Sequence, residues 1–227
     1  MQYKISGTTV PCVEITLGGN ESVYTQSGAM AWMDDGIEMD TNTRGGVLKG
    51  ISRMFAGESM FQSIYTARRP DAHITFASTV PGSIVACDLA GMPDIICQKG
   101  AFLCAQPSVN LDVVFTKRFS AGLFGGEGFI LQKLSGRGIA FLEVDGDAVE
   151  RVLAPGEVLK VDTGNIVAFE STVSYDIETV KGIKNVVFGG EGLFLTKLTG
   201  PGRVILQTMS FENFAQRIIM RIPTSNK

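Results

Sequence analysis

The stretch VFGGEGLFLTKLTG, residues 187–200, occurs almost unchanged a second time in the same chain. The second copy is LFGGEGFILQKLSG, residues 123–136, and a looser third copy is FAGESMFQSIYTA, residues 55–67. The Gly-Glu dipeptides of the three copies are separated by 69 and 64 residues. Because self-similarity at a nearly constant spacing is the signature of a repeat architecture, the sequence predicts a chain built from three units.

A second kind of segment alternates with the Gly-Glu segments and repeats at nearly the same spacing. It reads VYTQSGAMAWMDDGIEMD over residues 23–40, IICQKGAFLCAQPSVNLD over 95–112 and LKVDTGNIVAFESTVSYD over 159–176. Offsets of 72 and 64 residues align its shared positions, which include Gly28, Gly100, Gly164, Asp40, Asp112 and Asp176. Two independent kinds of segment therefore agree on the same repeat.

The residues after each Gly-Glu dipeptide alternate between apolar and polar. Alternation is typical of strands, because successive side chains point to opposite faces of a sheet. The turns Gly-Arg-Gly at 136–138 and Gly-Pro-Gly at 200–202 then predict that each Gly-Glu segment is a β-hairpin. The chain has 27 glycines, which suit many tight turns. We therefore expect an all-β fold made of β-sandwich or barrel units.

One segment departs from this pattern. Phe211, Phe214 and Ile218 recur at helical spacing, Ser210 precedes them as a possible N-cap, and Pro223 follows. These residues predict a short C-terminal helix over residues 211–222. Helical spacing of apolar residues also predicts a helical turn over residues 45–55.

The order of the segments suggests how the chain closes. Each unit needs both kinds of segment to bury its apolar faces, and the first and last segments of the chain are left without a sequence neighbour. We therefore predict that residues 13–40 pair with residues 186–210, while the other two units comprise residues 55–112 and 123–176. Residues 1–227 would then form a single compact unit with internal pseudo-threefold symmetry.

The composition excludes several classes of protein. Hydrophobic residues are 44% of the chain and charged residues 19%, which does not fit intrinsic disorder, and the net charge of −3 gives no basic field for nucleic acid. No apolar run approaches the roughly 18 residues of a membrane span, and the N-terminus lacks the apolar run of a signal peptide. The four cysteines form no CxxC motif. We expect a cytoplasmic protein with free thiols.

The Gly-Glu segments FAGESMFQSIYTA, FGGEGFILQKLSG and FGGEGLFLTKLTGPG resemble those of a widespread bacterial family of unknown function. That family is related to the mitochondrial altered-inheritance-of-mitochondria group, and the resemblance extends over residues 13–210. It implies a fold similar to the tryptophan RNA-binding attenuation protein (TRAP), with three TRAP-like β units in one polypeptide. It also implies a homotrimer whose nine units form a ring. No tryptophan-pocket or RNA-contacting motif of TRAP matches this chain residue by residue, so the resemblance does not carry that function.

The candidate site residues are acidic side chains that recur in every unit. They are Asp40, Asp112, Asp176, Glu58, Glu127 and Glu191. Threefold repetition could bring three carboxylates to one axis, where they would raise each other's pKa or bind a hard cation. The alternative is structural, since an acidic residue in a glycine turn accepts hydrogen bonds from nearby backbone N–H groups. Repetition in all three units is what a structural role predicts.

Catalytic motifs are not apparent. His73 is the only histidine, so a cupin-type metal enzyme with two or three histidine ligands is excluded. A Ser-His-Asp or Cys-His arrangement would have to use His73, which lies in a strand-like segment. The Gly-Gly-Glu-Gly loops could form an anion-binding nest, but strand-like residues follow them where a phosphate loop would lead into a helix.

The sequence therefore predicts a non-enzymatic oligomeric scaffold or binding protein that needs no cofactor and associates with itself. Two alternatives stay open. One is the binding of a small ligand or nucleic acid in clefts between repeats, as in TRAP. The other is an enzyme that uses carboxylates at the threefold axis.

We expect the purified protein to carry no stoichiometric zinc, iron or copper. The reason is that the chain offers one histidine and four scattered cysteines, whereas sites for these metals draw several ligands from those residue types. Elemental analysis of the protein by mass spectrometry measures this directly. One equivalent of any of the three metals per chain would contradict the expectation.

Overall fold

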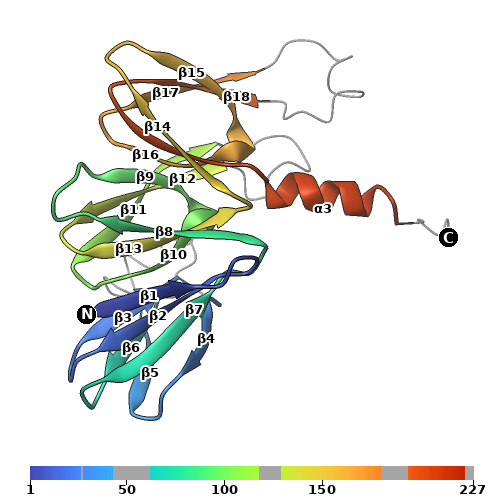
Figure 1. Ribbon diagram of the computed structural model, residues 1–227. Helices are drawn as coiled ribbons and strands as arrows, with labels where there is room; N and C mark the ends of the chain where they lie inside the picture. The colour runs from blue at the N-terminus through green and yellow to red at the C-terminus, as the bar shows by residue number, and fades with distance from the viewer. Residues whose placement is uncertain (27, 43–61, 118–128, 180–193, 223–227) are drawn as a thin grey trace.

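The computed structural model describes residues 1–26, 28–42, 62–117, 129–179 and 194–222. Over these residues most of the chain lies in antiparallel β-strands, which confirms the predicted all-β class (Figure 1). A short α-helix lies near the C-terminus, also as predicted. The helical turn predicted for residues 45–55 falls outside the described residues.

The strands of the described residues form four sheets. In order across the sheet, the first contains β1 (Gln2–Ser6), β2 (Cys12–Leu17), β7 (Ala72–Ala77) and β4 (Met30–Met33). The second contains β5 (Ile37–Asn42), β6 (Gln62–Ala67), β3 (Ser22–Thr25), β10 (Phe102–Ala105), β13 (Ile139–Asp145) and β8 (Gly82–Asp88). The third contains β11 (Val109–Lys117), β12 (Phe129–Gly136), β9 (Ile95–Gln98), β16 (Ile166–Glu170), β19 (Gly202–Gln207) and β14 (Ala148–Leu153). The fourth contains β15 (Val158–Asp162), β18 (Phe194–Thr199) and β17 (Ser174–Thr179).

Strand pairing follows one scheme in three successive segments, which we call unit 1 (residues 12–77), unit 2 (82–145) and unit 3 (148–207). In unit 1 the last two strands each lie between two earlier ones, β6 between β3 and β5, and β7 between β2 and β4. In unit 2, β12 lies between β9 and β11, and β13 lies between β8 and β10. In unit 3, β18 lies between β15 and β17, and β19 lies between β14 and β16.

This pairing corrects the prediction in two respects. Residues 13–40 pair with β6 and β7 of their own unit, and the described strands of residues 186–210 pair with β14 to β17. The expected pairing between the two ends of the chain is therefore wrong. The hairpins are also wrong, because the strands that meet at residues 136–138 or 200–202 belong to different sheets. Each Gly-Glu segment turns a corner from one sheet to another.

The corner at residues 136–138 shows why the glycines predicted a hairpin where the structure has none. Gly136 and Gly138 have φ angles of 101° and 149°, which L side chains rarely adopt. A Cβ on Gly136 would also lie 2.4 Å from the carbonyl oxygen of Ser108. A corner and a tight hairpin both need glycine at this point, so the turn composition alone does not distinguish them.

Neighbouring units share sheets as well as a chain. Units 1 and 2 meet in the second sheet, where Ala105 of β10 lies opposite Tyr24 of β3. Units 2 and 3 meet in the third sheet through three residue pairs between β16 and β9, centred on Phe169 and Ile96. The sheets therefore run through the boundaries between units.

The hydrophobic core crosses the same boundaries. Three clusters of buried side chains fill the space between the sheets; two draw residues from two units and the third draws residues from all three. Tyr24 of unit 1 packs in the cluster of unit 2, where its hydroxyl donates to the carbonyl oxygen of Val109 at 3.1 Å. Ile96 of unit 2 likewise packs in the cluster of unit 3. Each unit therefore completes its neighbour's core.

Helix α3 (Phe211–Ile219) extends away from the sheets (Figure 1). The hydroxyl of Ser210 accepts from the backbone N–H of Asn213 at 3.5 Å, so Ser210 is the N-cap that the sequence predicted. The helix ends at Ile219, three residues short of the predicted end, and buries none of its residues. Among the described residues, no helix has the length and apolar character needed to cross a membrane.

Candidate functional site

The predicted aspartates occupy matching positions on outer strands of three different sheets. Asp40, Asp112 and Asp176 lie exposed on β5, β11 and β17. Lys133 stands opposite Asp112 and Lys197 opposite Asp176, and opposite charges in such cross-strand positions stabilise a sheet. In the third case Asp40 stands opposite Ile64, and the Lys133 ammonium pairs with Asp94 at 2.7 Å. These strand positions are not the glycine turns that the structural alternative assumed, so the role of the aspartates stays a prediction.

The predicted glutamates Glu58, Glu127 and Glu191 lie outside the described residues. Within the parts of the chain that the structure describes, no three side chains of histidine, cysteine, aspartate or glutamate are grouped so that they could hold a metal ion. The described aspartates therefore do not form the axial carboxylate group that the sequence allowed.

Three of the four cysteines occupy buried sites that disfavour nucleophilic chemistry. The ring Nδ1 of His73, on β7, lies 3.4 Å from the Thr16 hydroxyl. Burial raises the pKa of the Cys87 thiol to about 11, and burial also raises the pKa of the Cys97 and Cys104 thiols. Thiols with raised pKa values stay protonated near neutral pH and react poorly.

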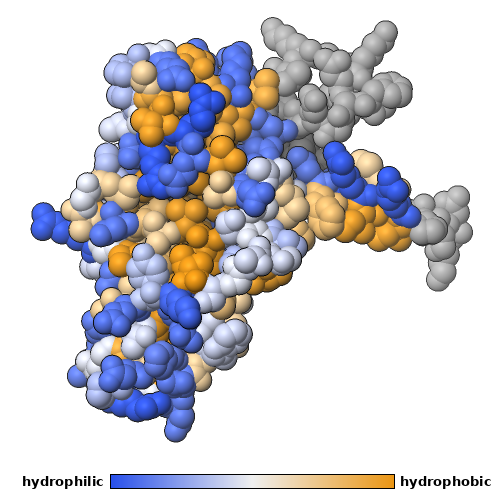
Figure 2. All heavy atoms as spheres, in the orientation of Figure 1, coloured by the Kyte–Doolittle hydropathy of each residue, from blue (hydrophilic) through white to orange (hydrophobic). Residues whose placement is uncertain are grey.

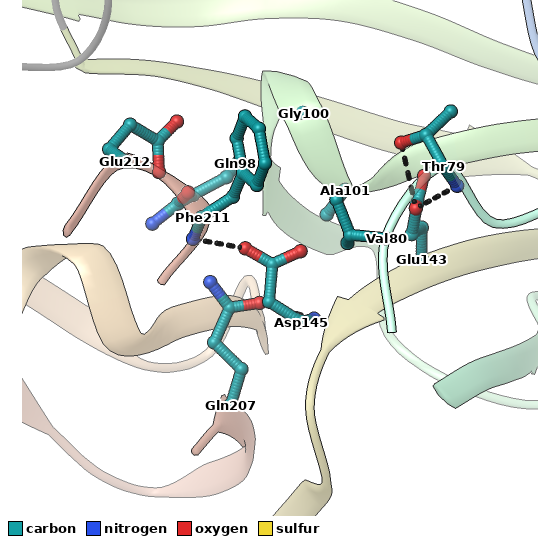
Figure 3. Close-up of a pocket in the computed structure, with 10 residues that line it drawn as sticks. All are labelled: Thr79, Val80, Gln98, Gly100, Ala101, Glu143, Asp145, Gln207, Phe211 and Glu212. Atoms are coloured by element: carbon teal, nitrogen blue, oxygen red, sulfur yellow. Dashed lines mark hydrogen bonds between the residues drawn. The ribbon is translucent and has the colours of Figure 1, made fainter. Parts of the chain in front are cut away.

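A cleft of about 420 Å³ opens beside the start of α3, where units 2 and 3 meet the connection between units 1 and 2 (Figure 3). One wall comes from the connection between β7 and β8, and another from the end of β9 and the one-turn 3-10 helix Lys99–Ala101. The ends of β13 and β19 and the first turn of α3 complete it. The lining residues are Thr79, Val80, Gln98, Gly100, Ala101, Glu143, Asp145, Gln207, Phe211 and Glu212.

Gln207, at the end of β19, ties two walls of the cleft together. Its Oε1 accepts from the backbone N–H of Asp145 at 3.0 Å, and its Nε2 donates to the carbonyl oxygen of Gly164 at 2.8 Å. The residue is only 9% exposed, so both ends of the amide satisfy backbone groups in a nearly dry environment. Gln207 thereby fixes unit 3 to the end of unit 2.

Glu143 occupies the equivalent position in unit 2. Leu142 and Leu206 lie opposite the first residue of the third strand of their units, and Glu143 and Gln207 directly follow them. The Oε1 of Glu143 accepts from the backbone N–H and the hydroxyl of Thr79 at 2.7 and 3.1 Å. Thr79 belongs to the connection between units 1 and 2, so the bond repeats at the next boundary. Unit 1 has Ala77 at this position, and alanine has no side-chain acceptor.

Asp145 is a partly buried carboxylate that faces the cleft (Figure 3). Burial raises its pKa above the ordinary value, and the nearby charges of Glu212 and Glu143 add to this effect. The hydrogen bond from the Phe211 N–H to Oδ2, 2.8 Å long, acts in the opposite direction. The lining residues include three carboxylates and no lysine or arginine. The cleft therefore suits a small cationic or hydrogen-bonding molecule better than an anion.

The sequence analysis did not single out Glu143, Asp145 or Gln207. A signal was present, because the equivalent strands GIAFLEV and RVILQTM each place a polar residue, Glu143 or Gln207, directly after an apolar run. The contribution of Phe211 and Glu212 had no comparable signal. They reach the cleft only because the chain turns back beside β13 after β19.

We expect Asp145→Asn to raise the free energy of unfolding at pH 7. The pKa of Asp145 is higher in the folded protein than in the unfolded chain, so the folded state binds this proton more tightly. The ionised carboxylate therefore costs stability once the pH exceeds the folded-state pKa. The gain of the variant over wild type should shrink toward zero as the pH falls below about 3.9, the ordinary aspartate pKa.

Denaturant unfolding of both proteins between pH 3.5 and 7 measures this difference. Asparagine retains an oxygen acceptor for the Phe211 N–H, so the hydrogen bond in the cleft is preserved. Asp35→Asn is the matched control, since it removes the same charge from an exposed turn. Equal gains at pH 7 in both variants would contradict the assignment to burial.

The comparisons with known proteins agree with this architecture. An uncharacterized protein of Streptococcus pyogenes serotype M6 is 30% identical over 224 residues, which cover 95% of this chain and 88% of that protein. The crystal structure of a Streptococcus pyogenes protein superimposes with a TM-score of 0.79 at 28% identity, covering 97% of this chain and 99% of the other. Residues 3–209 match the family described as Mitochondrial biogenesis AIM24, which confirms the resemblance indicated by the Gly-Glu segments. The chain belongs to the Mitochondrial biogenesis AIM24 family.

Proposed function

We propose that the protein is a non-enzymatic scaffold that associates with copies of itself into a homotrimer and needs no cofactor to do so. The observation that carries this proposal is the exposed apolar face of α3. The raised pKa values of the Cys87, Cys97 and Cys104 thiols, and the separation of the aspartates over three sheets, support a role without catalysis.

The apolar side chains of α3 and of the residues after it are unusually accessible. Phe214 is 49% exposed, Ile218 48% and Ile219 64%, and Met220 and Ile222 continue the series at 80% and 58%. Figure 2 shows apolar residues along one side of this helix. Burial of apolar surface is worth about 25 cal/mol per Å², so leaving such a stripe in water is costly. Contiguous exposed apolar surface of this kind marks an association site.

The position of α3 supports a second copy of the chain as the partner. After Glu143 of unit 2, the chain passes through Asp147 and enters β14, the first strand of unit 3. After the equivalent Gln207 of unit 3, the chain enters α3 at Phe211 over nearly the same length of chain. The helix therefore begins where a fourth unit would start. Unit 1 of another copy is the surface that would continue the series at this point.

The number of chains rests on the family resemblance. One pairing scheme in units 1, 2 and 3 supports an internal pseudo-threefold repeat of TRAP-like units. Three chains would supply nine such units, as the resemblance to TRAP implies for the ring. Closed symmetric rings are the usual form of soluble homo-oligomers, because a closed assembly leaves no contact surface unused.

We expect Phe214→Asp to lower the assembly mass of the protein at micromolar concentrations. The substitution places a charge in the middle of the apolar face of α3, which would then have to be desolvated on association. Light scattering coupled to size-exclusion chromatography should give three times the 24.3 kDa chain mass for wild type and a smaller mass for the variant.

Asn213→Asp is the control, because it adds the same charge one residue earlier, at the N-terminal end of α3 where a negative charge is favourable. This control should retain the wild-type mass. A monomer mass for wild type would refute the proposed scaffold. A dimer mass would keep the association and discard the threefold number.

A second candidate function is the binding of a small ligand, and the cleft of Figure 3 favours it. The cleft lies between units, where the TRAP resemblance places ligands, and its carboxylates and amides offer hydrogen-bonding groups. Most of these groups also join the units, through the bonds of Gln207 and Glu143. The scaffold is therefore preferred over the ligand site.

We expect Gly100→Leu to fill the cleft without disturbing the fold. A Cβ at Gly100 meets no heavy atom within 4 Å, and neither does one at Gly91, which lies in a turn outside the cleft and provides the matched control. If the second candidate is correct, native mass spectrometry of the isolated wild-type protein and of Gly91→Leu should show a bound molecule that Gly100→Leu lacks. Identical spectra for all three proteins would remove this candidate.

A further inference from the structure

The two junctions inside the chain use the same strands in the same register. At the first, Ala105 of β10 lies opposite Tyr24 of β3, and at the second, Phe169 of β16 lies opposite Ile96 of β9. Strands β3 and β9 are the second strands of their units, while β10 and β16 are the third strands of the next units. Each junction thus joins the second strand of one unit to the third strand of the following unit.

The residues at these junctions match one another position by position. Strands β4, β10 and β16 each carry a bulge at the same place, between Met30 and Trp32, Phe102 and Cys104, and Ile166 and Ala168. Each bulged strand pairs with the last strand of its unit. Alignment of these pairs makes Met33 the equivalent of Ala105 and Phe169. The second strands β3, β9 and β15 pair with β6, β12 and β18 in the same way. Alignment of these pairs makes Lys160 the equivalent of Tyr24 and Ile96.

The two ends of the series lack such a junction in the described chain. Strand β4, the third strand of unit 1, ends the first sheet, and β15, the second strand of unit 3, ends the fourth sheet. A strand edge of this kind presents backbone N–H and C=O groups that can pair with another strand. The edges at β4 and β15 are therefore the two halves of one missing junction.

Side-chain exposure supports the same conclusion. The residues at the two equivalent positions of the third strands, Cys104 and Ala105 in β10, are fully buried, and those in β16 are exposed by no more than 1%. In β4 the same positions hold Trp32 and Met33, which are 59% and 37% exposed. An exposed tryptophan beside an exposed methionine is typical of an interface. Positions that are buried at both internal junctions thus lie open at the end of the chain.

We propose that β15 of one copy pairs antiparallel with β4 of the next copy, with Lys160 opposite Met33 and Val161 opposite Trp32. This inference rests on the proposed self-association and names the edges and the register that produce it. The Lys160 ammonium bonds to Glu178 at 2.8 Å within its own sheet. Because β18 lies between β15 and β17, this ion pair draws the Lys160 side chain across β18 and away from the free edge of β15. The backbone of that edge stays accessible to β4.

The complementarity of the two edges selects a second copy as the partner. An unrelated strand could pair with β4 or with β15, but such a partner would not account for the matching positions of both edges. A contact between two different edges of the same chain is heterologous, and repetition of it builds a ring or an open series. The ring leaves neither β4 nor β15 unpaired, whatever the number of chains.

Disulfide trapping tests the register. In the variant Met33→Cys/Lys160→Cys, each cysteine lies near its partner in the next copy, and residues directly opposite across two strands are within disulfide reach. Mild oxidation should therefore give covalent multimers on non-reducing gels, ending at a closed species. Each single variant should give none beyond wild type, whose native cysteines are mostly buried.

The matched control is Met33→Cys/Val158→Cys, which moves one cysteine two residues along β15. This shifts it by roughly 6.6 Å, too far for the same bond. Multimers from this pair in place of the first would overturn the register. Absence of multimers from the in-register pair, in a wild-type protein that is oligomeric by light scattering, would overturn the seam and leave the scaffold standing. A monomeric wild type would refute the scaffold itself.

A non-covalent variant covers the case in which the double variant does not fold. Trp32→Glu places a charge on the β4 edge at a position that is exposed in the single chain, so the chain itself should melt like wild type. We expect it to lose the assembly mass. Val152→Glu is the control, since Val152 is 77% exposed on β14, another edge strand. Equal assembly of Trp32→Glu and Val152→Glu would overturn the proposed seam.

Discussion

The structure depends on the pairing of strand edges between units. A unit of six short strands has open edges, and an open edge leaves backbone hydrogen-bonding groups without partners. In this chain one edge of unit 1 pairs with unit 2, at Tyr24 with Ala105, and one edge of unit 2 pairs with unit 3, at Ile96 with Phe169. The packing follows from this arrangement, because a strand that pairs with the next unit places side chains in that unit's core, as Tyr24 does. For this reason the described strands of the three units lie next to one another in one stack (Figure 1).

The all-β class and α3 could be predicted from the sequence, because each depends on local spacing. The connectivity could not. Sequence similarity shows that Gly136 and Gly200 are equivalent, but equivalent glycines serve a hairpin and a corner equally well. The same similarity does not say whether residues 13–40 pair with the Gly-Glu segment that follows them or with the last one in the chain. Both pairings bury the same faces, and only the three-dimensional path of the chain decides between them.

The candidate site shows the same division between local and tertiary information. Repetition drew attention to Asp40, Asp112 and Asp176, which are exposed residues on outer strands. The cleft instead depends on residues whose roles arise at the boundaries between units, such as Asp145 and Gln207. A recurring residue reports what every unit needs, whereas a cleft between units uses positions that vary from one boundary to the next. Glu143 and Gln207 hold one position and differ in charge.

Ala77 leaves unit 1 without the side-chain hydrogen bond that Glu143 and Gln207 provide in units 2 and 3. Glu143 and Gln207 each fasten a unit to the connection or strand end that precedes it, whereas unit 1 enters any joint with another chain without a side-chain acceptor at this place. Joints between chains would then be held by backbone pairing and apolar contact alone. A ring of such chains would open between subunits while each polypeptide kept its internal boundaries closed. Subunits could exchange from one assembly to another in the folded state, and mixed rings would form from differently labelled populations.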